Sequence, residues 1–205
     1  VTGNLEKKGE VLRLWARTYP RDELVPNYEG NLYSQLRQYD RAAEAQREEI
    51  RRGPDSQFGY TNLADTYLHQ GRLAEAREVL RTALERKLDH ANVHYQLLLI
   101  AQLEGDQTVI ARETDWLRRH SPSDLASFEA TVAVARGRLG ESLRLRRQGA
   151  DLDVQRGLAQ AAAGALVYQS IFEMLVGHTA LARTLVEEAL HGGLTSGVYP
   201  TAASV

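Results

Sequence analysis

The stretch QFGYTNLADTYLHQGRLAEAREVLRTALERKLDH, residues 57–90, contains two apolar helical patterns with one glycine between them. The first pattern has the i, i+3, i+4, i+7 spacing of a single helix face, in Tyr60, Leu63, Ala64 and Tyr67. Leucines and alanines resume this spacing over residues 73–84, after Gly71. Because glycine reaches positive φ without steric cost, the stretch predicts two antiparallel helices joined by a tight turn.

The pattern recurs every 34 residues, and the end of each unit is marked in turn by Pro20, Pro54, Leu88 and Pro122. A unit of this length is one helical hairpin, which cannot bury its apolar face alone and must stack on copies of itself. The preceding unit has Gly30 in the position of Ala64, and small residues there let helices approach closely. It also places Arg37 where the next unit has Gly71, which predicts a turn that its residue disfavours.

These positions resemble the tetratricopeptide repeat (TPR) family. The family pattern has a leucine-glycine pair and a tyrosine in the first helix, glycine at the turn, paired alanines in the second helix and a final proline. The matching residues here are Leu63-Ala64, Tyr67, Gly71, Ala76 and Ala83, while Leu88 replaces the proline. The resemblance implies an all-α, right-handed superhelical solenoid of TPR-like antiparallel helix hairpins. In the third unit, Leu98 and Ile110 stand where small residues are usual, so we expect looser packing there.

We expect a single TPR-like repeat domain over residues 1–205. Its expected parts are a partial repeat 1–22, repeats at about 23–56, 57–90, 91–124, 125–156 and 157–191, and a tail 192–205. The fourth repeat has a first helix about two residues short of the period. The sequence starts within a repeat, without methionine, and shows no polar capping helix at its end, so we expect a fragment of a longer protein or ends covered by another chain.

The charge balance excludes several classes of function. With 25 basic and 27 acidic residues, the net charge of −2 gives no reason to expect nucleic-acid partners. Clusters such as Arg51-Arg52 fall late in predicted second helices, where cations favour the helix dipole. Cysteine is absent, which excludes disulfides and thiol catalysis. The sequence has no apolar run near 18 residues, so we expect no membrane insertion. The absence of cysteine favours a reducing compartment, and we expect a cytoplasmic location.

The sequence shows no catalytic constellation, and we expect no enzyme activity, cofactor or metal in this chain. His90 and His94 are four residues apart, but no third ligand is placed with them, so we interpret them as a partly exposed pair between repeats rather than a zinc site. The carboxylates of Glu48-Glu49 and Glu187-Glu188 are expected to be solvated and paired with nearby arginines.

The first helices of the repeats carry the candidate partner-binding residues, because in a TPR-like stack they line the inner surface. These residues are Asn27, Asn31, Gln35, Phe58, Asn62, Asp65, His69, Asn92, Tyr95 and Gln96. Carboxamides can bond a peptide backbone as donors and as acceptors, and exposed aromatic rings can anchor an apolar side chain. The pattern therefore predicts a surface that binds a protein or peptide; the alternative is a surface that is only hydrated.

Some TPR domains hold a C-terminal carboxylate with paired asparagines and several cations. Asn31 and Asn62 match the asparagines of that clamp, whereas Asn27, Asn92 and Gln96 stand where it has lysine or arginine. Without charge-assisted bonds a carboxylate is poorly held. We therefore expect a neutral or internal peptide segment as the partner.

A second resemblance concerns residues 14–22 and 33–39, which are similar to TPR tails of bacterial serine/threonine protein kinases or winged-helix regulators. It implies a regulatory part of a larger bacterial signalling protein. Two alternatives remain: a non-catalytic fragment that positions the substrates of such a kinase, and a structural solenoid that self-associates through its ends.

Overall fold

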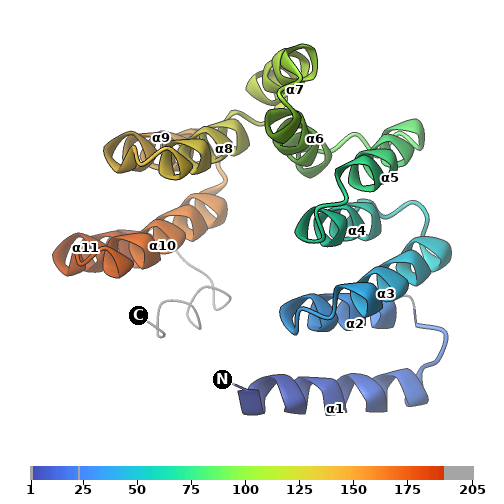
Figure 1. The fold of residues 1–205 in the computed structure, drawn as a ribbon. Helices are drawn as coiled ribbons and strands as arrows, with labels where there is room; N and C mark the ends of the chain where they lie inside the picture. The colour runs from blue at the N-terminus through green and yellow to red at the C-terminus, as the bar shows by residue number, and fades with distance from the viewer. Residues whose placement is uncertain (1, 23, 192–205) are drawn as a thin grey trace. The chain divides into compact units, whose positions relative to one another are not determined.

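The computed structural model describes residues 2–22 and 24–191, and these residues form eleven α-helices without a strand (Figure 1). The helices are α1 (Thr2–Thr18), α2 (Leu24–Gln35), α3 (Tyr39–Arg52), α4 (Gln57–His69), α5 (Leu73–Glu85), α6 (Ala91–Glu104), α7 (Gln107–His120), α8 (Pro122–Ala135), α9 (Leu139–Gln155), α10 (Ala159–Leu175) and α11 (Thr179–His191). The expected tail 192–205 lies outside the described residues. The all-α class is confirmed.

Successive helices pack as antiparallel pairs, with α2 on α3, α4 on α5, α8 on α9 and α10 on α11, while α1 packs on α2. The chain divides into two compact units, which we call unit 1 (Val1–Glu113) and unit 2 (Thr114–Val205). The division falls within α7, the second helix of the third hairpin.

The turn inside each hairpin contains one residue in the left-handed region. Glycine occupies this place at Gly71, Gly105, Gly137 and Gly177, with φ between 72° and 89°. In the first hairpin Arg37 takes the same conformation with φ of 57°, as its alignment with Gly71 predicts. For a residue other than glycine this conformation costs roughly 1–2 kcal/mol. The hairpin fold therefore imposes the left-handed conformation on Arg37 despite this cost.

The core of unit 1 is built on the apolar stripes that the sequence shows. Tyr60, Leu63 and Tyr67 of α4 are at most 5% exposed and pack in one cluster with Ala76 and Leu80 of α5. Alanine and glycine positions allow the helices to approach closely.

The first two hairpins meet around the buried Gln46 of α3. A Cβ atom on Gly30 would lie 2.9 Å from Gln46 Cγ, and Gln46 Oε1 accepts a hydrogen bond of 2.8 Å from Thr66 Oγ1. The side chain therefore packs against α2 and hydrogen-bonds to α4.

The core of unit 2 depends on alanines. Ala130 and Ala133 of α8 pack with Leu145 of α9, and a second cluster joins α9, α10 and α11. That second cluster contains Ala150, Ala162, Ala163, Leu166, Val167, Leu185 and Ala189. Small side chains on both partners allow these helices to approach closely.

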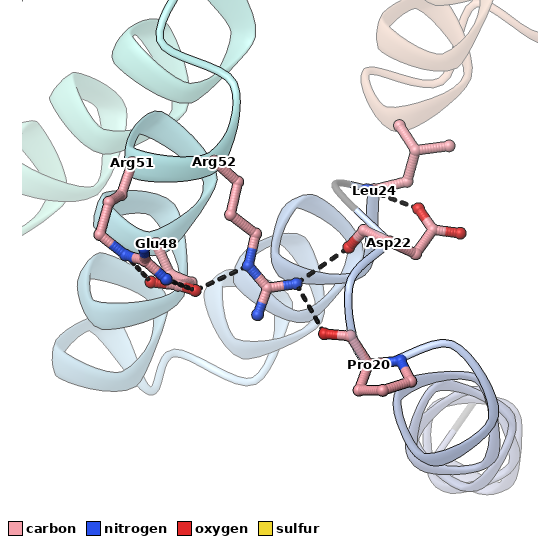
Figure 2. Close-up of polar contacts among 6 residues, drawn as sticks. All are labelled: Pro20, Asp22, Leu24, Glu48, Arg51 and Arg52. Atoms are coloured by element: carbon pink, nitrogen blue, oxygen red, sulfur yellow. Dashed lines mark hydrogen bonds and ion pairs between the residues drawn. The ribbon is translucent and has the colours of Figure 1, made fainter.

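Arg52 of α3 fixes the connection between α1 and α2 (Figure 2). Its Nη1 donates to the carbonyl oxygens of Pro20 (3.2 Å) and Asp22 (3.0 Å). Its Nε donates to Glu48 Oε1 at 2.6 Å, and Arg51 binds the same carboxylate. These hydrogen bonds lower the pKa of Glu48 to about 2. The predicted pairing of Glu48 with arginines is confirmed.

The side chain of Asp22 completes the same connection. Its Oδ1 accepts from the backbone N–H of Leu24 at 2.9 Å, and its Oδ2 accepts from Trp15 Nε1 at 3.0 Å. The loop between α1 and α2 is thus held from both of its own helices and from α3.

We expect alanine at Gly59 to destabilise the protein by about 1–3 kcal/mol, because the added Cβ would lie 2.8 Å from Ile50 Cγ1 on α3. The matched control is Gly164→Ala in α10, where no atom lies within 4 Å of the new Cβ. The control should gain about 0.5–1 kcal/mol from helix propensity alone. Urea unfolding of the two variants measures the difference, and a loss of equal size in both would contradict the close approach of α3 and α4.

Candidate functional site

The helices α2, α4 and α6 of unit 1 lie next to one another, since α4 contacts both α2 and α6. They carry the ten predicted partner-binding residues, each of which is partly or fully exposed. We call the surface formed by these ten side chains the first-helix face. It consists of Asn27, Asn31, Gln35, Phe58, Asn62, Asp65, His69, Asn92, Tyr95 and Gln96.

Asparagines on α2 connect this face to a buried carboxylate. Asn31 Nδ2 donates to Asn27 Oδ1 at 3.2 Å, and Asn27 Nδ2 donates to Glu49 Oε1 at 2.8 Å. Glu49 belongs to α3 and is 6% exposed. Asn27 stands where the carboxylate clamp has a cation. Its carboxamide therefore already binds an acidic side chain of the same chain.

The prediction of a solvated, arginine-paired Glu49 is wrong. Its partners are amides, and burial raises the pKa of its carboxyl group, although the carboxamides of Asn27 and Asn62 act in the opposite direction. Its Oε2 is buried and has no hydrogen-bond partner of ordinary geometry. The helical spacing does indicate that Glu49 is buried. It lies seven residues after Ala42 and three after Gln46, which are both buried on the same face of α3.

The glycine at position 59 makes the room that this carboxylate occupies. A Cβ atom there would lie 3.3 Å from Glu49 Cγ and 3.4 Å from Glu49 Cδ. The acid therefore sits against the first turns of α4, close to Asn62 of the first-helix face.

One stripe of α4 presents an aromatic ring, an amide, an acid and an imidazole. Phe58, Asn62, Asp65 and His69 follow the i, i+4, i+7, i+11 spacing, and Phe58 is 55% exposed. Asp65 Oδ2 lies 3.5 Å from His69 Nε2, and the His69 ring stacks on Tyr39 at 5.4 Å. The surrounding protein raises the pKa of Asp65, although its side chain is still 55% exposed.

Gln96 connects α6 to α4. Its Nε2 donates to the carbonyl oxygen of Thr61 at 3.0 Å, while its Oε1 is buried and has no hydrogen-bond partner. Glu49 Oε2 and Gln96 Oε1 are thus two buried acceptors that lack a hydrogen bond of ordinary geometry, beside one turn of α4, residues 59–62.

The remaining predicted residues are Gln35, Asn92 and Tyr95. Gln35 Oε1 accepts from Lys8 Nζ of α1 at 3.3 Å. Asn92 is exposed at the start of α6, where its backbone N–H donates to His90 Nδ1. Tyr95 is partly exposed, between Asn92 and Gln96 in sequence.

The interpretation of His90 and His94 as a partly exposed pair is wrong for His94, which is 6% exposed. Its Nδ1 lies 2.5 Å from Glu113 Oε2, and its Nε2 lies 2.5 Å from Asp89 Oδ1. Arg112 Nη2 lies 2.7 Å from the other oxygen of Glu113. The imidazole thus belongs to a charged network that links α6 with α7, which the spacing of the histidines alone could not reveal.

In the residues 2–22 and 24–191, no group of three or more histidine, aspartate or glutamate side chains could hold a metal ion. No helix in that described part is long and apolar enough to cross a membrane. Glu188 is paired with an arginine, as predicted, but the partner is Arg147 of α9 at 2.7 Å and not a neighbour on its own helix.

Comparison with known proteins agrees with this architecture. Residues 59–90 match the family model of the tetratricopeptide repeat. The chain is similar to TTC0263, a thermophilic TPR protein of Thermus thermophilus, with a TM-score of 0.57 and 22% identity over 80% of this chain and 93% of that one. It also resembles a chain of the APC/C hetero-tetramer Cut9-Hcn1, with a TM-score of 0.58 and 11% identity over 94% of this chain and 38% of that one. No curated protein matches the sequence. Residues 59–90 are thus similar to a tetratricopeptide repeat, and the chain shares the helical-hairpin fold of TPR structures.

We expect the His94 network to make unit 1 less stable as the pH rises. Burial lowers the pKa of His94, but hydrogen bonds and charges from Glu113 and Asp89 outweigh it and raise the pKa overall. The folded state therefore holds this proton more tightly than the unfolded state. The resulting stabilisation is complete below about pH 6.5 and is lost as the pH passes the higher folded value.

A double variant, His94→Tyr with Glu113→Val, copies the residues found one repeat earlier, Tyr60 and Val79. It should remove this part of the pH dependence and remain folded, whereas His90→Gln should retain the dependence. Urea unfolding midpoints between pH 6 and 9 measure the effect. The same pH slope in wild type and the double variant would show that His94 does not cause it.

Proposed function

We propose that unit 1 is an interaction module that binds a peptide or protein partner on the first-helix face. The observation that carries this proposal is a pair of buried acceptors in unit 1 that lack a hydrogen bond of ordinary geometry, Glu49 Oε2 and Gln96 Oε1. An unpaired buried polar group costs about 1–3 kcal/mol, so the free protein carries a penalty that a ligand's N–H groups would relieve.

The chemistry of the surrounding residues supports the same function. Phe58 offers an exposed ring beside Asn62, and an aromatic anchor next to hydrogen-bonding groups is typical of binding hot spots. The side chains project from three packed helices, and Asn27 and Gln96 are already oriented by hydrogen bonds. A face held by rigid elements loses little conformational entropy when it binds.

The same contacts disfavour a C-terminal carboxylate as the ligand. The ten residues of the face include no lysine or arginine, and Asn27 donates its N–H group to Glu49. An internal segment of a partner chain is therefore the ligand that we propose.

The wider context of the module rests on the sequence resemblance. A regulatory part of a larger bacterial signalling protein, with a kinase or winged-helix domain, remains a prediction, as do the fragment that positions kinase substrates and the cytoplasmic location. Self-association is the second candidate function, because Val11 and Leu14 of α1 are 58% and 66% exposed. A sedimentation mass that grows with concentration would support it.

The test of the binding proposal uses a phage-displayed library of random twelve-residue peptides selected on the immobilised chain. We expect recovered peptides to lose at least about tenfold in affinity for the variant Asn31→Ala, Asn62→Ala, Tyr95→Ala, because hot-spot truncations cost that much or more. Fluorescence polarisation with labelled peptides measures the loss.

The matched control carries three exposed substitutions on second helices of unit 1, Glu44→Ala, Arg81→Ala and Glu85→Ala. It should bind as the wild type does. Recovered peptides that bind all three proteins equally would contradict binding on the first-helix face.

A further inference from the structure

Glu49 is a buried carboxylate whose charge the described part of unit 1 leaves uncompensated. Two other buried glutamates each have an imidazole partner: Glu113 has His94 at 2.5 Å, and Glu173 has His178 at 2.8 Å. Glu49 has only the carboxamides of Asn27 and Asn62, which carry no charge. A buried ion without a counter-ion is costly, and the cost falls when an opposite charge is brought to it.

This acid adjoins residues of the first-helix face. It lies against Gly59, and both of its amide neighbours, Asn27 and Asn62, belong to the face. Its Oε2 is covered by protein, so a ligand reaches it only after a side chain turns away. Asn62 is partly exposed and adjacent, and rotation of one such side chain is a fast, low-cost movement.

The stripe of α4 beside this acid suits a cationic side chain. Phe58 and Asn62 are four residues apart on one helix face, so the exposed ring stands beside the amide that interacts with Glu49. Methylene stems of lysine and arginine pack on apolar surface, and their charged heads are attracted to aromatic faces. Asp65 adds a second negative group on the same stripe, and the face offers no competing cation among its ten residues.

Building on the proposed function, we propose that the first-helix face selects a peptide segment with a lysine or arginine, whose cationic head binds the Glu49 carboxylate while its stem lies along Phe58. Backbone N–H groups of the same segment would meet Gln96 Oε1 on the other side of this turn of α4. A neutral segment could satisfy the two acceptors but would leave the charge of Glu49 uncompensated. The charge balance therefore favours the cationic ligand.

The experiment selects the random twelve-residue library on three proteins in parallel: wild type, Glu49→Gln and Glu48→Gln. Glu48→Gln is the matched control, since it removes the same charge one residue away, from an acid that pairs with Arg51 and Arg52. We expect lysine and arginine to be enriched in peptides recovered on wild type and on the control. The enrichment should disappear on Glu49→Gln.

A synthetic copy of one recovered peptide is then used to measure the interaction between its basic side chain and Glu49. Replacing its lysine by norleucine, or its arginine by citrulline, should weaken binding to wild type about tenfold or more and to Glu49→Gln less than about twofold. Glu49→Gln keeps an acceptor for Asn27 and removes a buried charge, so it should melt at the same temperature as wild type or higher.

The outcomes separate this inference from the proposed function. Peptides that require the first-helix face but show no basic enrichment, or show it equally on Glu49→Gln, overturn the inference and leave the binding function in place. A clearly lower melting temperature of Glu49→Gln assigns the acid a structural role and also overturns it. If no recovered peptide depends on the face, the proposed function fails and this inference fails with it.

Discussion

Close contact between helices at small residues is the constraint on which unit 1 depends. One hairpin cannot bury its apolar stripe alone, so α2 and α4 pack on their own second helices, and α4 and α6 pack on the helix pair before them. Gly59 shows how tight this arrangement is, because a single added carbon would lie 2.8 Å from Ile50. The same glycine leaves the space that Glu49 fills. The packing that holds the hairpins together therefore also places an acid beneath the first-helix face.

The sequence predicts the helical elements well because their signals are local. The spacing of Tyr60, Leu63 and Tyr67 predicts the buried side of α4, and Gly71 and Gly177 predict turns that the structure confirms. The environments of Glu49 and His94 were missed because their partners lie 22 and 19 residues away on other helices. Helical periodicity identifies which side of a helix is buried, but it does not identify the polar group across the interface.

The buried glutamates among the described residues fall into two kinds according to their partners. Glu113 and Glu173 face imidazoles, and their contacts join a helix to its neighbour or to the following turn. Glu49 faces only amides, which carry no charge. A glutamate with an imidazole partner serves the fold, whereas a buried charge without a counter-ion lowers stability unless something else uses it. This contrast distinguishes Glu49 from Glu113 and Glu173 as a candidate for recognition.

The contacts of Arg52 with the loop between α1 and α2 have a mechanical consequence. Among the described side chains of α1, Leu12 alone is fully buried, so this helix depends strongly on polar contacts near its C-terminal end. Under force, hydrogen bonds break after a much smaller displacement than a packed apolar interface does. Under a pulling force applied at residue 2, α1 should peel away as a separate step before the α2–α3 hairpin opens, and the first-helix face would stay intact while the tether lengthens.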